Sequence, residues 1–317
     1  MPDRPSAWRG LIALVRLSFQ RQAQLGAMGW STILLVLLVA AITAAVRMER
    51  SGWNFETRWS GRYRIAYQDY PAATLDRVQM LPLPGFGGGI TAMAFAPFRA
   101  MLVDPRFRSD FEFVNYSRWI VFSLYLGFLL PLVNLALGTH ALGGEREKRT
   151  LIWLLTRPLP RPAIYLATWL ALLPWSVMVS LASLAVIGFA GGEVGREAAW
   201  RFAPAAALGS VAFASLFHLV GSIVRRPAVM GLAYIFFFET LVAILPGSLK
   251  QLSINYYVKS LFYKATADRV ATLTPEALEV YAPAQPTTAT VTLVLASLLL
   301  TAAGAWWFGR AEPTAET

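Results

Sequence analysis

The sequence predicts an all-α integral membrane protein with six transmembrane helices. Of its 317 residues, 56% are hydrophobic and 15% are charged, whereas soluble domains average roughly 45–50% and 25%. This much apolar surface cannot all be hidden in one soluble core, so the surplus must face lipid. Six mostly apolar stretches are long enough to cross a bilayer, which takes about 20 residues of helix. We expect them to form a single membrane domain over residues 1–317.

The charge and the cysteine content narrow the function classes further. The chain has no cysteine, which excludes disulfides, zinc–thiolate sites and cysteine nucleophiles. Its net charge of +10 would suggest nucleic acid as a partner in a soluble protein, but membrane proteins concentrate Lys and Arg in their cytoplasmic loops. Because no basic run alternates with an aromatic platform, we expect no nucleic-acid partner.

The amino-terminal residues 1–26 predict a helix that lies flat on the cytoplasmic side of the membrane. Within Ser6–Leu25, apolar residues recur at helical spacing beside arginines that can reach anionic headgroups; the apolar residues are Trp8, Leu11, Ile12, Val15 and Phe19. An ordinary cytoplasmic lead-in is the alternative. We expect the span that follows to be retained, not cleaved as a signal peptide, because the polar region before it is long.

The six predicted spans are Ala27–Val46, Trp119–Leu142, Ala163–Ala190, Phe202–Val224, Ala228–Leu245 and Thr288–Phe308. Several are bordered by tryptophans, as is typical of the membrane interface; these are Trp30, Trp119, Trp200, Trp306 and Trp307. The stretch Gly85–Val103 is excluded because glycines, Pro97 and Arg99 interrupt it. Residues 47–118 and 246–287 are too long for plain connectors, and we expect them to form a small extracytoplasmic cap.

The distribution of basic residues predicts the orientation. With both termini inside, the inner segments hold most of the arginines, as the positive-inside rule requires; among them are Arg16, Arg146, Arg149, Arg225, Arg226 and Arg310. A short outer loop is expected near Glu193, where two arginines are balanced by two glutamates. An even number of spans then places both termini in the cytoplasm.

The most informative passage is the cytoplasmic loop at 143–162, within the stretch Ala141–Ala171. After a charged cluster at 145–149, Thr150 can cap a short helix with its hydroxyl. Pro158 ends this helix, because the residue before a proline avoids helical geometry. Its apolar stripe consists of Leu151, Leu154 and Leu155. Such a helix could dock into the cleft of a soluble partner, or it could simply let the chain turn round.

This passage resembles the coupling region of the type 2 family of ABC transporter permeases. In that family a Glu-rich cluster, a Gly-Thr-Leu, a Leu-Leu pair, a Pro and an Arg follow one another at this spacing. The matching residues are Glu145, Glu147, Thr150, Leu151, Leu154, Leu155, Pro158 and Arg161. The sequence departs from the pattern at Arg149, where Gly is usual, and at Thr168, where a Lys often begins the span. The amino-terminal helix, six spans and cytoplasmic termini resemble the family over most of the chain.

The resemblance implies a permease subunit of an ATP-driven exporter in a bacterial inner membrane. It implies two partners besides membrane lipid: a second permease copy, identical or homologous, and a nucleotide-binding ATPase subunit. The coupling residues, Arg157 included, would carry movement from that subunit to the spans. This chain contains no phosphate-binding loop of the Gly-x-x-x-x-Gly-Lys-Ser/Thr type, so ATP and Mg would be bound by the partner. We expect no cofactor, no metal and no catalytic residues here.

Two polar residues within predicted spans are candidates for a transport pathway, because ionisable groups in a bilayer are often functional. Glu239 in the fifth span could line a substrate path, or it could pair with another helix. His218 in the fourth span could line the path or be a hydrogen-bonded packing residue. An intramembrane enzyme would need a serine, zinc or paired-aspartate motif, and none lies in the predicted spans. A channel or a secondary transporter without an ATPase is the alternative function.

Overall fold

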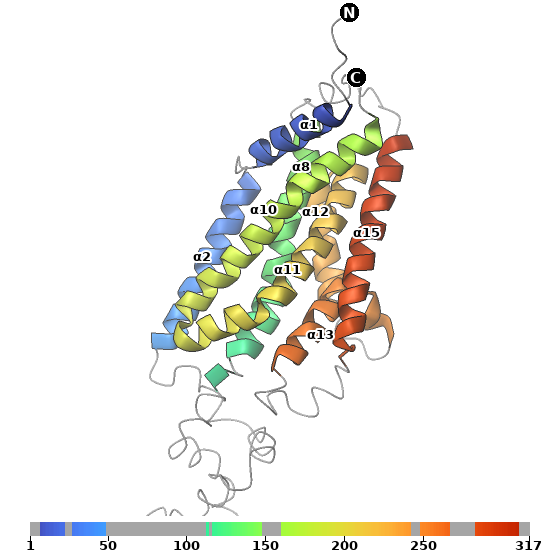
Figure 1. Ribbon diagram of the computed structural model, residues 1–317. Helices are drawn as coiled ribbons and strands as arrows, with labels where there is room; N and C mark the ends of the chain where they lie inside the picture. Colours follow the sequence, from blue (N-terminus) through green and yellow to red (C-terminus); the bar gives the residue numbers. More distant parts are fainter. Residues whose placement is uncertain are drawn as a thin grey trace, which may run out of the picture.

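The computed structural model describes residues 7–22, 27–48, 112–113, 116–147, 160–241, 248–266 and 283–310, and every element within these ranges is helical (Figure 1). The predicted all-α class is thus confirmed. The elements are α1 (Ala7–Gln22), α2 (Ala27–Met48), η2 (Ser117–Leu129), α8 (Leu130–Glu147), α10 (Arg161–Ala190), α11 (Gly192–Ile223), α12 (Pro227–Ala233), η3 (Tyr234–Leu241), η5 (Ser248–Leu252), α13 (Ile254–Thr266) and α15 (Pro286–Arg310). The long helices lie side by side in one bundle, which α1 crosses at one end.

Five helices in the described residues are long and apolar enough to cross a membrane. They are Gly29–Met48, Ser117–Ala141, Arg161–Ala190, Gly192–Ile223 and Pro286–Arg310. The predicted fifth span, Ala228–Leu245, is represented by the shorter apolar helix Pro227–Glu239, where α12 continues into the π-helix η3. All five tryptophans that were predicted to border spans are exposed, as expected of side chains that face lipid or an interface. The chain is therefore a multi-pass membrane protein.

The connection between α10 and α11 differs from the one predicted from the sequence. An outer loop was expected near Glu193, but α10 ends at Ala190 and α11 begins at Gly192, with Gly191 between them. The physical reason is a contact between the two helices: a Cβ atom on Gly195 would lie 2.2 Å from the carbonyl oxygen of Gly188. Only glycine permits this approach, so the charged residues after Gly192 occupy the first turns of α11.

Two side chains from outside α10 and α11 contact this tight turn. The hydroxyl of Tyr116 donates to the carbonyl oxygen of Ile187 over 3.1 Å, and its ring lies where a side chain on Gly191 would be. Gly192 has a φ of +80°, and the guanidinium of Arg47 lies beside it. A cation at the end of α10 is favourable because the last carbonyl groups of a helix carry partial negative charge. The end of α2 is thereby held against the α10–α11 turn.

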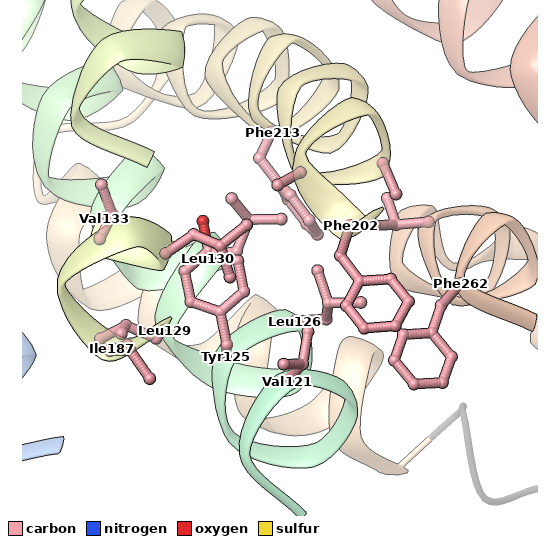
Figure 2. Close-up of a cluster of buried hydrophobic side chains, with 14 of the residues drawn as sticks. Val121, Tyr125, Leu126, Leu129, Leu130, Val133, Ile187, Phe202, Phe213 and Phe262 are labelled. Carbon is pink, nitrogen blue, oxygen red and sulfur yellow. The ribbon is translucent and has the colours of Figure 1, made fainter. Parts of the chain in front are cut away.

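The core of the bundle is an aromatic and aliphatic cluster to which η2, α8, α10, α11 and α13 all contribute (Figure 2). Within it the rings of Phe202 on α11 and Phe262 on α13 stack with centroids 4.3 Å apart. Phe122 on η2 contacts Phe262 with centroids 5.1 Å apart. Lipid tails are as apolar as these side chains, so their association depends on close packing more than on removal from water.

The helix α13 belongs to the segment 246–287 that was predicted to be extracytoplasmic. Its side chains enter the bundle: Val258 packs against Gly209 of α11, where a Cβ atom would lie 2.9 Å from it. Ile254, Val258 and Phe262 are all buried. The remainder of this segment, and nearly all of 47–118, lie outside the described residues, so the cap stays a prediction.

The helix α1 falls within the predicted range Ser6–Leu25 and lies against α10 and α15. Leu14 is fully buried in a cluster with Ile164, Tyr165 and Phe308. The predicted apolar stripe is divided: Val15 packs against this cluster, whereas Ile12 is 53% exposed. Phe19 is 37% exposed, and the centroid of its ring lies 5.2 Å from that of Trp175 on α10. The buried side of α1 therefore overlaps the predicted stripe only in part.

The contact between Gly188 and Gly195 leads to a stability prediction. Gly195→Ala places a methyl group against backbone that cannot move aside, so the helices must separate, at a cost of about 1–3 kcal/mol. The measurement is thermal unfolding of the purified chain in detergent. Gly127→Ala is the matched control, because its Cβ would meet its nearest neighbours at an ordinary 3.5 Å. Equal midpoints for the two variants would contradict this account of the turn.

Candidate functional site

The described helices place both ends of the predicted coupling loop. Glu145 and Glu147 belong to the last turn of α8, and Arg161 is the first residue of α10, after Pro160 at its amino-terminal cap position. The structure does not describe the side chains of Glu145 and Glu147. The other predicted coupling residues lie wholly outside the described residues; they are Thr150, Leu151, Leu154, Leu155, Arg157 and Pro158.

The loop emerges at the end of the bundle where α1 lies. Ile164 near the start of α10 and Phe308 near the end of α15 share a buried cluster with Leu14 of α1. A Cβ atom on Gly309 would lie 3.0 Å from the ring of Pro162, so these two helix ends are in contact. Figure 1 shows α1 and the end of α15 at this same end. The start of α10, the end of α15 and the helix α1 therefore lie at one end of the bundle.

His218 on α11 is fully buried and faces α10. Its Nε2 lies 3.2 Å from the hydroxyl of Thr168, and that hydroxyl donates to the carbonyl oxygen of Tyr165 over 2.9 Å. Nε2 and this hydroxyl share one hydrogen bond across the contact between α10 and α11. The backbone of Gly138 lies beside the ring, yet Nδ1 has no hydrogen bond of normal geometry with the described residues. His218 thereby joins α10 and α11.

Asn134 on α8 is the centre of a buried polar network that the sequence analysis did not identify. Its side-chain amide donates to the carbonyl oxygen of Leu130 over 2.8 Å and to the hydroxyl of Ser180 over 3.2 Å. Ser176 donates to the side-chain oxygen of Asn134 over 2.5 Å and is also 3.1 Å from the carbonyl oxygen of Ser210. All of these side chains are 0% exposed. The network therefore links α8, α10 and α11 in the interior.

The signal for this network was present in the sequence. Asn134 is a lone amide in an apolar span, and Ser176 and Ser180 are four residues apart, so they lie on one face of α10. Hydrogen bonds between helices in a membrane contribute about 0.6 to 2 kcal/mol each. The sequence could not predict that this face of α10 meets the face of α8 that carries Asn134.

Glu239 is 1% exposed and accepts hydrogen bonds on both carboxyl oxygens. Tyr234, five residues earlier, donates to Oε1 over 2.6 Å. Ser253 donates its hydroxyl to Oε2 over 2.5 Å, and the backbone N–H of Asn255 donates to the same oxygen over 3.0 Å. The carboxyl group of η3 is thus bound to the start of α13, an element that follows it in the chain.

Lys259 lies one turn after Asn255 on α13. Its ammonium group lies 4.5 Å from the centroid of the Phe122 ring on η2, which is a cation–π contact. The side-chain amide of Asn255 reaches η2 as well, 3.5 Å from the carbonyl oxygen of Gly127. Glu239, Asn255 and Lys259 therefore connect η3, α13 and η2.

No group of three or more metal-ligating side chains occurs in the part of the chain that the structure describes. Glu239 and His218 lie on separate elements and each has its own hydrogen-bond partners. The arrangement can orient helices and hold them in register.

Comparison with known proteins gave one family. A model of the ABC-2 family of transporter proteins matches residues 27–312. A search of curated proteins found no match. The family match begins at the first residue of α2 and extends just beyond the end of α15, so it contains all five membrane-crossing helices and the coupling loop.

The Asn134 network predicts that its members depend on one another. Asn134→Leu keeps the approximate volume but leaves the hydroxyls of Ser176 and Ser180 without their amide partner, so the thermal unfolding midpoint should fall. Ser176→Ala should also lower it, and the double variant should lose less than the sum of the two, because both remove the same bond. Ser222→Ala is the control, since that hydroxyl donates to Leu219 within its own helix. Additive losses would mean that Asn134 and Ser176 act separately.

Proposed function

The chain belongs to the ABC-2 family of transporter proteins, and from this premise we propose that it couples ATP hydrolysis by a separate nucleotide-binding subunit to export of a substrate. Membership makes the chain the membrane permease of an ABC transporter, a multi-pass transport subunit of a generally non-catalytic kind. Such a permease works with an ATP-binding subunit. In our proposal that partner binds ATP and Mg, and this chain holds no cofactor.

The observation that carries the proposal is the family match over residues 27–312, combined with the coupling pattern between α8 and α10. In the proposal, the segment Thr150–Arg157 forms a helix that docks into the ATPase. Closure of the ATPase on ATP moves this helix, and α8 and α10 transmit the movement because α8 ends before this segment, at Glu147, and α10 begins after it, at Arg161. The Asn134 network makes α8, α10 and α11 move together.

We also propose six crossings with both termini in the cytoplasm of a bacterial cell, in its inner membrane. The five long spans would by themselves leave the two termini on opposite sides. The end of α15 nevertheless lies beside α1. A further crossing by α12, η3 and the residues up to η5 reconciles these two facts. The basic residues Arg225 and Arg226, between α11 and α12, are exposed and belong on the cytoplasmic side under the positive-inside rule.

A second permease copy completes the transporter in this proposal. Much of the apolar surface of α2 is exposed, including Leu34 at 70% and Leu38 at 55%, and it is available to lipid or to another copy. Glu239 and His218 are 1% and 0% exposed within a single copy. We therefore propose that they support the transport pathway by holding its helices in place, without touching cargo.

The proposed orientation predicts which positions a membrane-impermeant thiol reagent can reach. The chain has no cysteine, so single cysteines report without background. In intact cells, cysteines at Arg146 and Arg225 should resist the reagent, while cysteines at Trp59 and Glu276 should react. Permeabilised cells provide the control, in which all four positions should label. Labelling of Arg146 from outside would reverse the orientation.

The docking of the loop makes the strongest prediction of function. Burial of one leucine side chain in a protein contact contributes roughly 1.5–3 kcal/mol. Leu154→Asp together with Leu155→Asp forfeits two such contributions and places charge in an apolar cleft. The ATPase should no longer co-purify with the permease, or its ATP turnover should be uncoupled, while membrane insertion and permease yield stay near normal.

The control for this experiment is Thr156→Asp, which adds charge to the same segment off the leucine stripe and should be tolerated. If the double aspartate variant keeps its ATPase and couples turnover to transport, the loop is only a connector. The channel or secondary-transporter function would then be favoured.

A further inference from the structure

The start of α13 is built to receive a carboxyl group. Ser253 precedes the helix, and its oxygen accepts the backbone N–H of Tyr256 over 3.2 Å, as an amino-terminal cap does. The same hydroxyl donates its proton to Glu239. The N–H of Asn255 is among the first of the helix, which have no carbonyl partner within it, and it also donates to Glu239. The partial positive charge of a helix start favours a carboxylate there.

The carboxyl group comes from a different part of the fold. Glu239 lies 14 residues before Ser253 and 16 before Asn255, on the π-helix that continues α12. Tyr234 donates to its other oxygen from within η3, so each of the two carboxyl oxygens is held by a different segment. One buried group thus bonds both segments.

Each of these two segments is in turn fixed to a different part of the bundle. The α12–η3 segment is fixed through α12, which begins shortly after the end of α11. Gly231 of α12 lies directly against Leu135 of α8. On the other side, α13 contacts α11 through Val258 and Phe262, and η2 through Asn255 and Lys259. A displacement of α12 can therefore reach α13 by way of Glu239.

We propose that Glu239 is a positioning residue that ties α13 to the α12–η3 segment, so that the two move as one unit. This proposal rests on the proposed function, in which movement begins beside the coupling loop. The tie would carry that movement to the opposite end of the bundle. A plain capping role would stabilise α13 without joining it to α12. The two roles can be separated by experiment.

The first variant is Glu239→Leu. Leucine is of similar size but neither donates nor accepts a hydrogen bond, so Tyr234, Ser253 and Asn255 all lose this partner. Amide hydrogen exchange at the start of α13, measured on the full chain in lipid nanodiscs, should accelerate roughly tenfold or more, while exchange in α10 and α11 stays unchanged. Ser260→Ala is the matched control on α13: its hydroxyl bonds Tyr256 and Ala284, and the variant should leave the helix start protected.

The second measurement reports on the tie itself. Val229 on α12 and Leu252 at the end of η5 are 63% and 65% exposed, and both can carry spin labels. With Glu239 present, the distance between the labels should have a narrow distribution. In Glu239→Leu the distribution should broaden, because η5 and α13 are no longer held to η3.

The deciding variant adds Ser253→Asp to Glu239→Leu. Aspartate at this position caps α13 locally, and the introduced leucine offers it no hydrogen bond, so the bond to η3 stays broken. Exchange at the start of α13 should return toward its original rate while the distance distribution stays broad. If Ser253→Asp narrows the distribution as well, or if Glu239→Leu changes neither measurement, the tie does not exist.

A further variant keeps the proposal testable if Glu239→Leu does not fold. Ser253→Ala retains the carboxyl group and removes one of its two bonds to α13, so it should broaden the distribution in the same direction and by less; an unchanged distribution would contradict the proposal. All of these measurements use the chain alone. Absence of an ATPase partner would overturn the proposed function and leave these results as they are.

Discussion

The fold depends on a single constraint: inside a membrane no water is available, so each polar group must find its partner within the protein. Helices satisfy the backbone, and many buried side chains among the described residues follow the same requirement, with Nδ1 of His218 and the hydroxyl of Tyr165 as exceptions. Thr43 and Ser297 donate to carbonyl oxygens four residues earlier in their own helices. Pro131 has no N–H to give to the preceding turn, and Asn255 reaches Gly127 in that turn from α13. Polar contacts therefore mark where elements must stay together.

Close packing of side chains holds the helices together in a membrane, where the removal of apolar surface from water does not contribute as it does in a soluble core. Where helices approach most closely the residues are glycines, as at Gly188 and Gly195 between α10 and α11, or at Gly231 against Leu135. Small residues let backbones approach and gain van der Waals contact. The Asn134 network occupies the same interior and adds direction to this contact, because its hydrogen bonds form in one register only. Packing and polar bonds together make α8, α10 and α11 a firm unit.

A transporter subunit must be firm in some places and able to move in others. The unit of α8, α10 and α11 carries both ends of the loop that we propose to dock into the ATPase. The α12–η3 segment is shorter, has π-helical geometry over Tyr234–Leu241 and presents Phe236 and Phe237 outward, 56% and 70% exposed. Its fixed point is Glu239, which binds α13. This division suggests that movement passes through few, well-defined contacts.

The sequence by itself determined the membrane class, the approximate spans and the family, because apolar length and a short coupling pattern are local properties of the chain. It also identified Glu239 and His218 as unusual residues, and Asn134 could have been added by the same reasoning. Only the tertiary structure decided what these residues bond: Glu239 meets Ser253 and Asn255 on another element. It likewise moved the start of α11 to Gly192. Such contacts depend on which faces of distant helices meet, and helical periodicity gives the faces but never their partners.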